Sequence, residues 1–195
     1  IVPGHHHERN SMPVAADHGV KRLLYLFRSK IPQGDIKQAG GLDEGRTAID
    51  KALHEPINRG TAQSFRTTVG KGCFVMSYVH LAHDCHVGDG VIISNGTQLA
   101  GHVTIEDRVI ISGLVAVHQF VKIGRHAFVG GCSRVAKDVP PFLKAVGNPV
   151  KLYGLNSVGL TRSGFSEETV RELKRAYRLF FRSELNVSQA MERAR

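Results

Sequence analysis

The chain has 195 residues, enough for one domain or for one domain with an appendage. Hydrophobic residues make up 42% and charged residues 22%, as in an ordinary globular protein, and the longest strongly apolar run near the start, Leu23 to Phe27, is far too short to cross a bilayer, so no stable membrane insertion is expected. The formal charge of +9 points to an acidic partner without choosing among nucleic acid, an anionic membrane surface, a phosphorylated substrate and an acidic protein.

The first 56 residues show no regular period. They include the stretch "GHHHERNSMPVAADHG", in which the run His5-His6-His7 is a tag remnant, a metal-binding tract or a chance run. We therefore expect an atypical N-terminal region, in which the repeats that dominate the following residues are degenerate or partial.

Residues 69 to 135 repeat with a period of six. Every sixth residue from the start of this stretch is Val, Leu or Ile, through twelve successive positions. The positions two earlier are small or β-branched, which favours strands, and the position after each aliphatic residue is often Gly, Ala or Ser, which favours tight corners. The twelve aliphatic positions are Val69, Val75, Leu81, Val87, Ile93, Leu99, Ile105, Ile111, Val117, Ile123, Val129 and Val135.

A period of six fits neither a helix with 3.6 residues per turn nor an alternating strand. It is typical of a triangular coil with one hexad on each side and three hexads, or 18 residues, in each turn. The sequence therefore predicts an all-β fold, a left-handed parallel β-helix of hexapeptide repeats with about four coils, followed by a C-terminal α-helical region. The predicted inward columns are Val69-Val87-Ile105-Ile123, Val75-Ile93-Ile111-Val129 and Leu81-Leu99-Val117-Val135.

The stretch "SYVHLAHDCHVGDG" at residues 77–90 is rich in histidine, and the repeat predicts which of these residues meet. Residues i and i+18 of such a coil lie one strand spacing apart, about 4.8 Å. His83 is therefore expected to stack on Gly101, and Asp84 on His102. The histidines expected along this edge are His80, His83, His102 and His118, and those expected on other edges are His86 and His126.

A histidine-lined edge can serve two kinds of chemistry. Imidazoles can bind zinc, which takes three or four N, S or O ligands, and one neutral imidazole can act as a general base near neutral pH. A glycine backbone N–H on the next coil would suit a developing oxyanion. We prefer the general base, because no H-E-x-x-H or C-x-x-C spacing favours a metal.

The hexad pattern ends after Pro140-Pro141, and a helical pattern follows. Ser166 is the expected N-cap of a helix, with Glu167 and Glu168 in its first turn, where they complement the helix dipole. The apolar positions at helical spacing are Val170, Leu173, Tyr177 and Phe180, and the opposite face carries Arg171, Lys174, Arg175, Arg178 and Arg182. This basic face is either simply solvated or a docking surface for an acidic protein.

Several of these stretches together resemble the UDP-N-acetylglucosamine O-acyltransferases, which begin lipid A synthesis. The stretches are "VHLAHDCHVGDG", "LAGHVTIED", "AVHQFVKIG", "VGGCSRVAKDVPP" and "GLTRSGFS". The resemblance begins at "INRGT", residues 57–61, and it is specific because "AHDC" and "AVHQF" at this separation distinguish the family from other hexapeptide transferases. It implies a homotrimer that moves a 3-hydroxyacyl chain from acyl carrier protein to the 3-hydroxyl of UDP-N-acetylglucosamine, without a metal or an organic cofactor.

The resemblance also implies roles for individual residues. His83 matches the family's general base, Asp84 the aspartate that orients it, and Gly101 the glycine whose N–H faces the oxyanion. Gly131 matches the position that measures acyl-chain length, where a small residue leaves room for a longer chain and the nearby Phe128 would shorten it. The residues that match the lining of the sugar-nucleotide and acyl pocket are His80, His102, His118 and Gln119.

Downstream, Asn156 and Arg162 match nucleotide contacts of the family. Two neighbouring positions depart from some of its members, which have an acidic residue in place of Val158 and a second arginine in place of Ser163. Recognition of uridine and phosphate is therefore expected to rest on fewer groups in this chain.

The stretch "PQGDIKQAG" at residues 32–40 resembles the family's sugar-binding loop, so Asp35 and Lys37 are expected to hold the substrate. The C-terminal helices are expected to be cut short relative to the family. The expected organisation is an atypical N-terminal region at 1–56, a hexapeptide-repeat β-helix at 57–147 and a C-terminal helical region at 148–195.

Three cysteines, Cys73, Cys85 and Cys132, form neither a C-x-x-C pair nor an even disulfide set, which suits a reducing compartment and hence a cytoplasmic protein. The resemblance favours acyl carrier protein as the acidic partner, and no nucleic acid. Two other interpretations keep the fold: a zinc-dependent lyase resembling the hexapeptide-repeat carbonic anhydrases, and a non-catalytic homologue that binds sugar nucleotide or acyl carrier protein without turnover.

Overall fold

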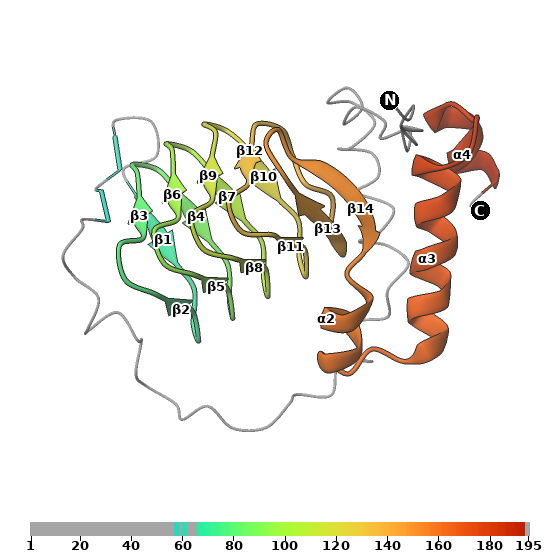
Figure 1. Cartoon of the computed structure of the whole chain (residues 1–195), viewed down its shortest axis with the longest axis horizontal. Coiled ribbons are helices and arrows are strands. Elements are labelled where there is room, and N and C mark those ends of the chain that lie inside the picture. The colour runs from blue at the N-terminus through green and yellow to red at the C-terminus, as the bar shows by residue number, and fades with distance from the viewer. Residues whose placement is uncertain (1–56, 59, 62–65, 194–195) are drawn as a thin grey trace, which may run out of the picture.

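Each hexad places an outward residue and then an inward aliphatic residue in one short strand, so the strands of the coil are only two residues long. A computed structural model of the chain describes residues 57–58, 60–61 and 66–193. Within these residues the chain winds into a parallel β-helix whose coils stack along one axis (Figure 1). Asp35 and Lys37 lie outside the described residues.

Three parallel sheets form the sides of the coil. Sheet A contains β1 (Thr68–Val69), β4 (His86–Val87), β7 (Thr104–Ile105) and β10 (Lys122–Ile123). Sheet B contains β2 (Phe74–Val75), β5 (Ile92–Ile93), β8 (Ile110–Ile111), β11 (Phe128–Val129), β13 (Leu143–Val146) and β14 (Lys151–Leu155). Sheet C contains β3 (His80–Leu81), β6 (Gln98–Leu99), β9 (Ala116–Val117) and β12 (Arg134–Val135). Successive turns of one sheet are therefore 18 residues apart.

The register confirms the three inward columns predicted from the hexads. Val69 pairs with Val87, Val75 with Ile93 and Leu81 with Leu99, and the later coils continue each column. The inward side chains from Leu81 to Val135 are at most 3% exposed, so the aliphatic columns are the core of the molecule. Each buried Val, Leu or Ile stabilises the coil by roughly 1.5–3 kcal/mol.

Corners join the sheets, and three edges run along the stack. The C–A edge comprises residues 82–84, 100–102 and 118–120, the A–B edge comprises 70–72, 88–90, 106–108 and 124–126, and the B–C edge comprises 76–78, 94–96, 112–114 and 130–132. The third residue of each corner has a left-handed backbone conformation, even where it is not glycine. Asp84 (φ 58°) and His102 (φ 60°) are examples. This conformation costs a non-glycine residue free energy, and the ladder bonds on either side of each corner hold it in place.

The last coil ends in a hairpin that the hexad pattern did not predict. β13 continues sheet B in parallel with β11, and β14 then returns antiparallel to β13. The buried Phe142, just before β13, anchors a second apolar cluster with Leu160 and Leu173. This cluster joins the β-helix to the helices that follow.

The C-terminal helices are α2 (Ser157–Arg162), α3 (Glu167–Phe181) and α4 (Val187–Arg193). The predicted start of α3 is confirmed, because the Ser166 side chain accepts a hydrogen bond from the Thr169 N–H. Leu173 and Tyr177 are buried on its inner face, which packs against β14. Within residues 66–193, none of the helices has the length and apolar composition that crossing a bilayer requires.

Candidate active site

His83 and Asp84 form a hydrogen-bonded pair at the first described turn of the C–A edge. The His83 Nδ1 lies 2.9 Å from the Asp84 Oδ2, with the histidine side chain 38% exposed and the aspartate side chain 1% exposed. A carboxylate can only accept hydrogen bonds, so Nδ1 carries the proton and the lone pair of the ring lies on Nε2. The partly exposed Nε2 is therefore the atom that can take a proton from a substrate.

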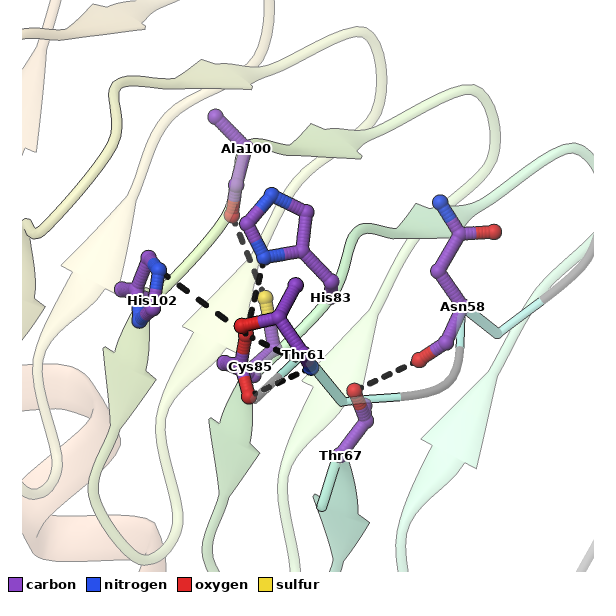
Figure 2. A network of polar contacts seen from close by, with 8 residues as sticks. Asn58, Thr61, Thr67, His83, Cys85, Ala100 and His102 are labelled. Carbon is purple, nitrogen blue, oxygen red and sulfur yellow. Dashed lines mark hydrogen bonds and ion pairs between the residues drawn. The ribbon is translucent and has the colours of Figure 1, made fainter. Parts of the chain in front are cut away.

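The Asp84 carboxylate is held by a second group that sequence analysis missed. Thr61 donates to it from both its hydroxyl, 2.6 Å from Oδ2, and its backbone N–H, 3.0 Å from Oδ1 (Figure 2). Thr61 and Asp84 are 23 residues apart, a spacing that the 18-residue register does not relate. "INRGT" contributed only to the family resemblance, and nothing in its composition signals this contact.

Gly101 lies directly against the His83 ring, as the 18-residue register predicts. A Cβ atom at Gly101 would come within 2.5 Å of the His83 Cε1 and 2.7 Å of the Nε2. Only glycine therefore lets the next coil approach this ring. Among the described residues, no acceptor receives the Gly101 N–H. A backbone donor that no protein group uses, beside a basic nitrogen, suits an oxyanion.

His102 completes a cluster of three titratable groups. Its Nε2 lies 3.8 Å from the Asp84 Oδ2, and its ring meets the His83 ring edge-on with centroids 5.1 Å apart. Phe120 stacks on its other side at 4.7 Å, again as the register predicts. The stacking order His83–Gly101 and Asp84–His102–Phe120 is thus confirmed, while the chemical roles of these residues stay predictions.

The same cluster has the composition of a metal site. One ligand atom each of His83, Asp84 and His102 lies within 4.8 Å of the others. The Asp84 Oδ2 already accepts hydrogen bonds from Thr61 and His83, however, and a zinc ion would have to displace the Nδ1 proton to bind that nitrogen. The donors around the carboxylate fit a base with its orienting acid better than they fit a metal centre.

The other predicted pocket residues surround this cluster at different depths. His80, in β3, is half-buried on the outer face of sheet C. His118 and Gln119 are exposed one coil further along the C–A edge, where the His118 Nδ1 lies 3.1 Å from the Gln119 carbonyl oxygen. The structure therefore brings His83, Asp84, Gly101 and His102 together, and places His118 and Gln119 farther along the same edge.

Phe128 and Gly131 lie away from the C–A edge. Gly131 is exposed on the B–C edge, where a Cβ atom would come within 3.3 Å of the Gly113 carbonyl oxygen. Phe128 points outward from β11, and its neighbours on sheet B are Ile110 and Lys144. Sheet C separates this pair from His83, so a ligand that touches both must reach across that face.

Asn156 has a structural task in this chain. Its Oδ1 accepts from the Gly159 N–H and so caps α2, while its Nδ2 donates to the His126 carbonyl oxygen at 3.0 Å. Arg162 is exposed in the last turn of α2. The predicted nucleotide contacts thus lie on a short helix that Asn156 ties to the A–B edge.

His126 is the one strongly perturbed histidine among the described residues. It is 5% exposed, stacked against Phe142 and edge-on to Phe165. Burial, helped by the nearby positive charges of Arg108 and Arg125 and opposed by Asp107, lowers the pKa of His126 to about 4. It is therefore neutral near pH 7 and unable to serve the site from where it lies.

The comparisons with known proteins agree with this geometry. Residues 66–101 match the family profile described as bacterial transferase hexapeptide (six repeats), and residues 138–195 match the one described as Udp N-acetylglucosamine O-acyltransferase, domain 2. The acyl-[acyl-carrier-protein]--UDP-N-acetylglucosamine O-acyltransferases of Gloeothece citriformis and Synechocystis sp. are 43% and 45% identical over 160 residues, 81% of this chain. The crystal structure of a UDP-N-acetylglucosamine acyltransferase from Bacteroides fragilis matches with a TM-score of 0.70 at 41% identity, covering 72% of this chain and 55% of that one.

The coil of hexads with a histidine–aspartate pair on one edge places the molecule among the hexapeptide-repeat proteins. Within that class, the chain belongs to the UDP-N-acetylglucosamine O-acyltransferase family. The matched part of the chain covers 58% of the length of the Gloeothece relative and 58% of the Synechocystis relative.

Proposed function

We propose that the chain transfers a 3-hydroxyacyl group from acyl carrier protein to the 3-hydroxyl of UDP-N-acetylglucosamine, in the cytoplasm and as the first step of lipid A synthesis. The single observation that carries this proposal is the His83–Asp84 pair, with its free Nε2 beside the unused N–H of Gly101. The names of the relatives supply the substrates.

In the proposed reaction, the His83 Nε2 takes the proton of the sugar hydroxyl as its oxygen attacks the thioester carbonyl carbon. The new C–O bond pushes the carbonyl electron pair onto its oxygen, which accepts a hydrogen bond from the Gly101 N–H. Collapse of this intermediate breaks the C–S bond. The departing thiolate then receives the proton from the His83 imidazolium, and the Asp84 carboxylate stabilises that cation while it exists.

The basic face of α3 supports acyl carrier protein, an acidic protein, as the donor's carrier. The exposed cations of this face are Arg171, Lys174, Arg175, Arg178 and Arg182. Among the described residues, none of them has an ion-pair partner. Unpaired surface charge of one sign speeds association with an oppositely charged protein, in a way that weakens with salt.

An apolar ladder on sheet B supports a homotrimer. Outward-facing apolar side chains run along four coils of this face, with Phe74 50% exposed at one end; they are Phe74, Ile92, Ile110 and Phe128. A face of this kind is normally covered, and a second copy of the chain would cover it. The predicted acyl-measuring residues Phe128 and Gly131 would then lie at the interface between copies.

The experiment that tests this function is acyl transfer by the purified chain from hydroxyacyl carrier proteins of several lengths to UDP-N-acetylglucosamine, with the product identified by mass. We expect transfer by the parent, a loss of at least about 100-fold in His83→Ala, and no such loss in His86→Ala. His86 is the matched control, because it lies three residues away on the outer face of sheet A and bonds to Thr68. A trimeric parent that binds both substrates without product would select the non-catalytic homologue.

A zinc-dependent lyase is the second candidate, and the His83–Asp84–His102 cluster is the observation that favours it. It predicts about one tightly held zinc per chain, bound by three or four ligands, and loss of activity on chelation. Metal analysis of the purified protein decides between the two candidates, because the proposed acyl transfer is indifferent to chelators.

A further inference from the structure

Thr61 makes contacts that tie the chain preceding the β-helix to the centre of the site. Its hydroxyl lies 2.6 Å from the Asp84 Oδ2, and its N–H lies 3.0 Å from Oδ1 and 3.1 Å from Oδ2. The N–H therefore bridges both carboxylate oxygens, and the hydroxyl adds a short, charge-assisted bond to the oxygen that also receives His83. Figure 2 shows Thr61 converging on this carboxylate together with the two imidazoles.

Thr61 itself is held by its flanking chain. The Asn58 N–H donates to the Leu81 carbonyl oxygen at 2.9 Å, and the Asn58 carbonyl oxygen accepts from the Thr67 hydroxyl at 2.6 Å. Leu81 is the inward residue of β3, the strand that leads directly into His83. The position of Thr61 is thus set by the same rung of the coil that sets the position of the imidazole.

Two imidazoles compete for one oxygen of Asp84. The His83 Nδ1 lies 2.9 Å from the Asp84 Oδ2, and the His102 Nε2 lies 3.8 Å from the same atom. A small rotation of the carboxylate would shorten the second distance and lengthen the first. The bridging N–H and the hydroxyl of Thr61 oppose that rotation, because it would stretch their bonds to both oxygens.

We propose that Thr61 is a positioning residue: it holds the Asp84 carboxylate on His83 rather than on His102, and so keeps the proton of His83 on Nδ1 and the reactive lone pair on Nε2. This inference rests on the proposed function, in which that lone pair takes the proton of the sugar hydroxyl. Thr61 touches no reacting atom and acts only through Asp84.

The test compares Thr61→Val with Thr61→Ser in the full-length chain. Valine keeps the shape and the N–H but lacks the hydroxyl, whereas serine restores it. We expect kcat to fall about 10- to 100-fold in Thr61→Val, the range that corresponds to losing one hydrogen bond to a charged group. The KM for both substrates should stay near the parent value, and Thr61→Ser should recover most of the lost kcat. The matched control is Thr68→Val, which removes a threonine hydroxyl bonded to the His86 imidazole on another face.

A second measurement reads the proton directly and needs no turnover. In protein labelled with ¹⁵N-histidine at pH 8, the ring-nitrogen shifts of His83 should report the Nδ1-protonated form in the parent and in Thr61→Ser. In Thr61→Val they should report a mixture with the Nε2-protonated form. Unchanged His83 shifts together with a kcat within about twofold of the parent would overturn the assignment. A loss that serine does not recover, or that Thr68→Val shares, would also overturn it. A parent without transfer activity would defeat the proposed function alone, and the ring shifts would still decide the role of Thr61.

Discussion

His102 and His126 occupy the same position of the hexad on two different edges, and they have opposite fates. Both have the left-handed corner conformation (φ 60° and 54°), and both stack on a phenylalanine at the next turn of their edge, His102 on Phe120 at 4.7 Å and His126 on Phe142 at 6.0 Å. The frame and the neighbours are alike. The covering differs, because Phe165 closes over His126, whereas Phe120 is itself 66% exposed.

The same contrast holds for the backbone donors of the two edges. On the A–B edge, side-chain carboxylates cap the corner N–H groups of the neighbouring coil: the Asp89 Oδ1 accepts from the Lys71 N–H, and the Asp107 Oδ1 from the Asp89 N–H. On the C–A edge, Asp84 holds an imidazole instead, and the Gly101 N–H has no acceptor among the described residues. Identical hexads thus build either a structural seam or a reactive one, depending on which polar groups their side chains leave free.

The largest effect should follow from closing the gap on the reactive seam with Gly101→Ala. The added Cβ would lie 2.5 Å from the His83 ring, which is half-exposed and can swing outward, so the fold should survive and the base should leave Asp84. We expect kcat/KM for acyl transfer to fall at least about 100-fold, as for a misplaced catalytic group.

The matched control for this change is Gly113→Ala at the same hexad position on the B–C edge. There the nearest atom to a new Cβ would be the Asn95 carbonyl oxygen at 3.2 Å, so a small shift accommodates it. Most of the transfer activity should remain. Equal losses in the two alanine variants would mean that glycine serves the corner rather than the chemistry.

The next effect concerns the covered imidazole. The pKa of His126 is lowered to about 4 from its ordinary 6.5, so the unfolded chain binds a proton in this interval that the folded chain excludes. The free energy of unfolding should therefore fall as the pH drops from 6.5 towards 4, by roughly 3 kcal/mol from this residue. Above pH 6.5, the His126 contribution should be constant.

His126→Phe should remove that part of the pH dependence. Phenylalanine fits the corner, because Phe120 and Phe142 adopt the same left-handed conformation (φ 65° and 66°), and the Asn156 bond goes to the backbone carbonyl, which remains. Denaturant unfolding at pH 7 and pH 4.5, at one protein concentration, measures the difference. Parallel stability curves for parent and variant would show that burial does not control this proton.

A smaller effect is expected on the structural seam. Asp107→Ala removes the acceptor of the Asp89 N–H at 2.9 Å, which should lower stability by about 1 kcal/mol, or roughly 2–4 °C in Tm. Asp107→Asn keeps a side-chain oxygen in place and should lose less. Acyl transfer per folded chain should be unchanged in both, and a transfer defect in Asp107→Ala would show that the two edges are not independent.

The hexad period predicted the columns of the core and the adjacency of His83 with Gly101, because a strict 18-residue register turns sequence spacing into spatial neighbours. It could not predict Thr61 beside Asp84, since residue 61 precedes the first described strand and obeys no register. The fate of His126 was hidden for a related reason. The register placed it on another edge, but Phe165 and α2, which cover that edge, lie beyond the repeat and pack by tertiary contacts that no local period encodes.

The most direct test of the account is acyl transfer from hydroxyacyl carrier protein to UDP-N-acetylglucosamine by three proteins side by side: the parent, His83→Ala and His86→Ala. The account predicts product from the parent and from His86→Ala and, because the base at the C–A edge is gone, a loss of at least about 100-fold in His83→Ala. Equal transfer by all three proteins would contradict the assignment of His83 as the base and, with it, the reactive role given to the C–A edge.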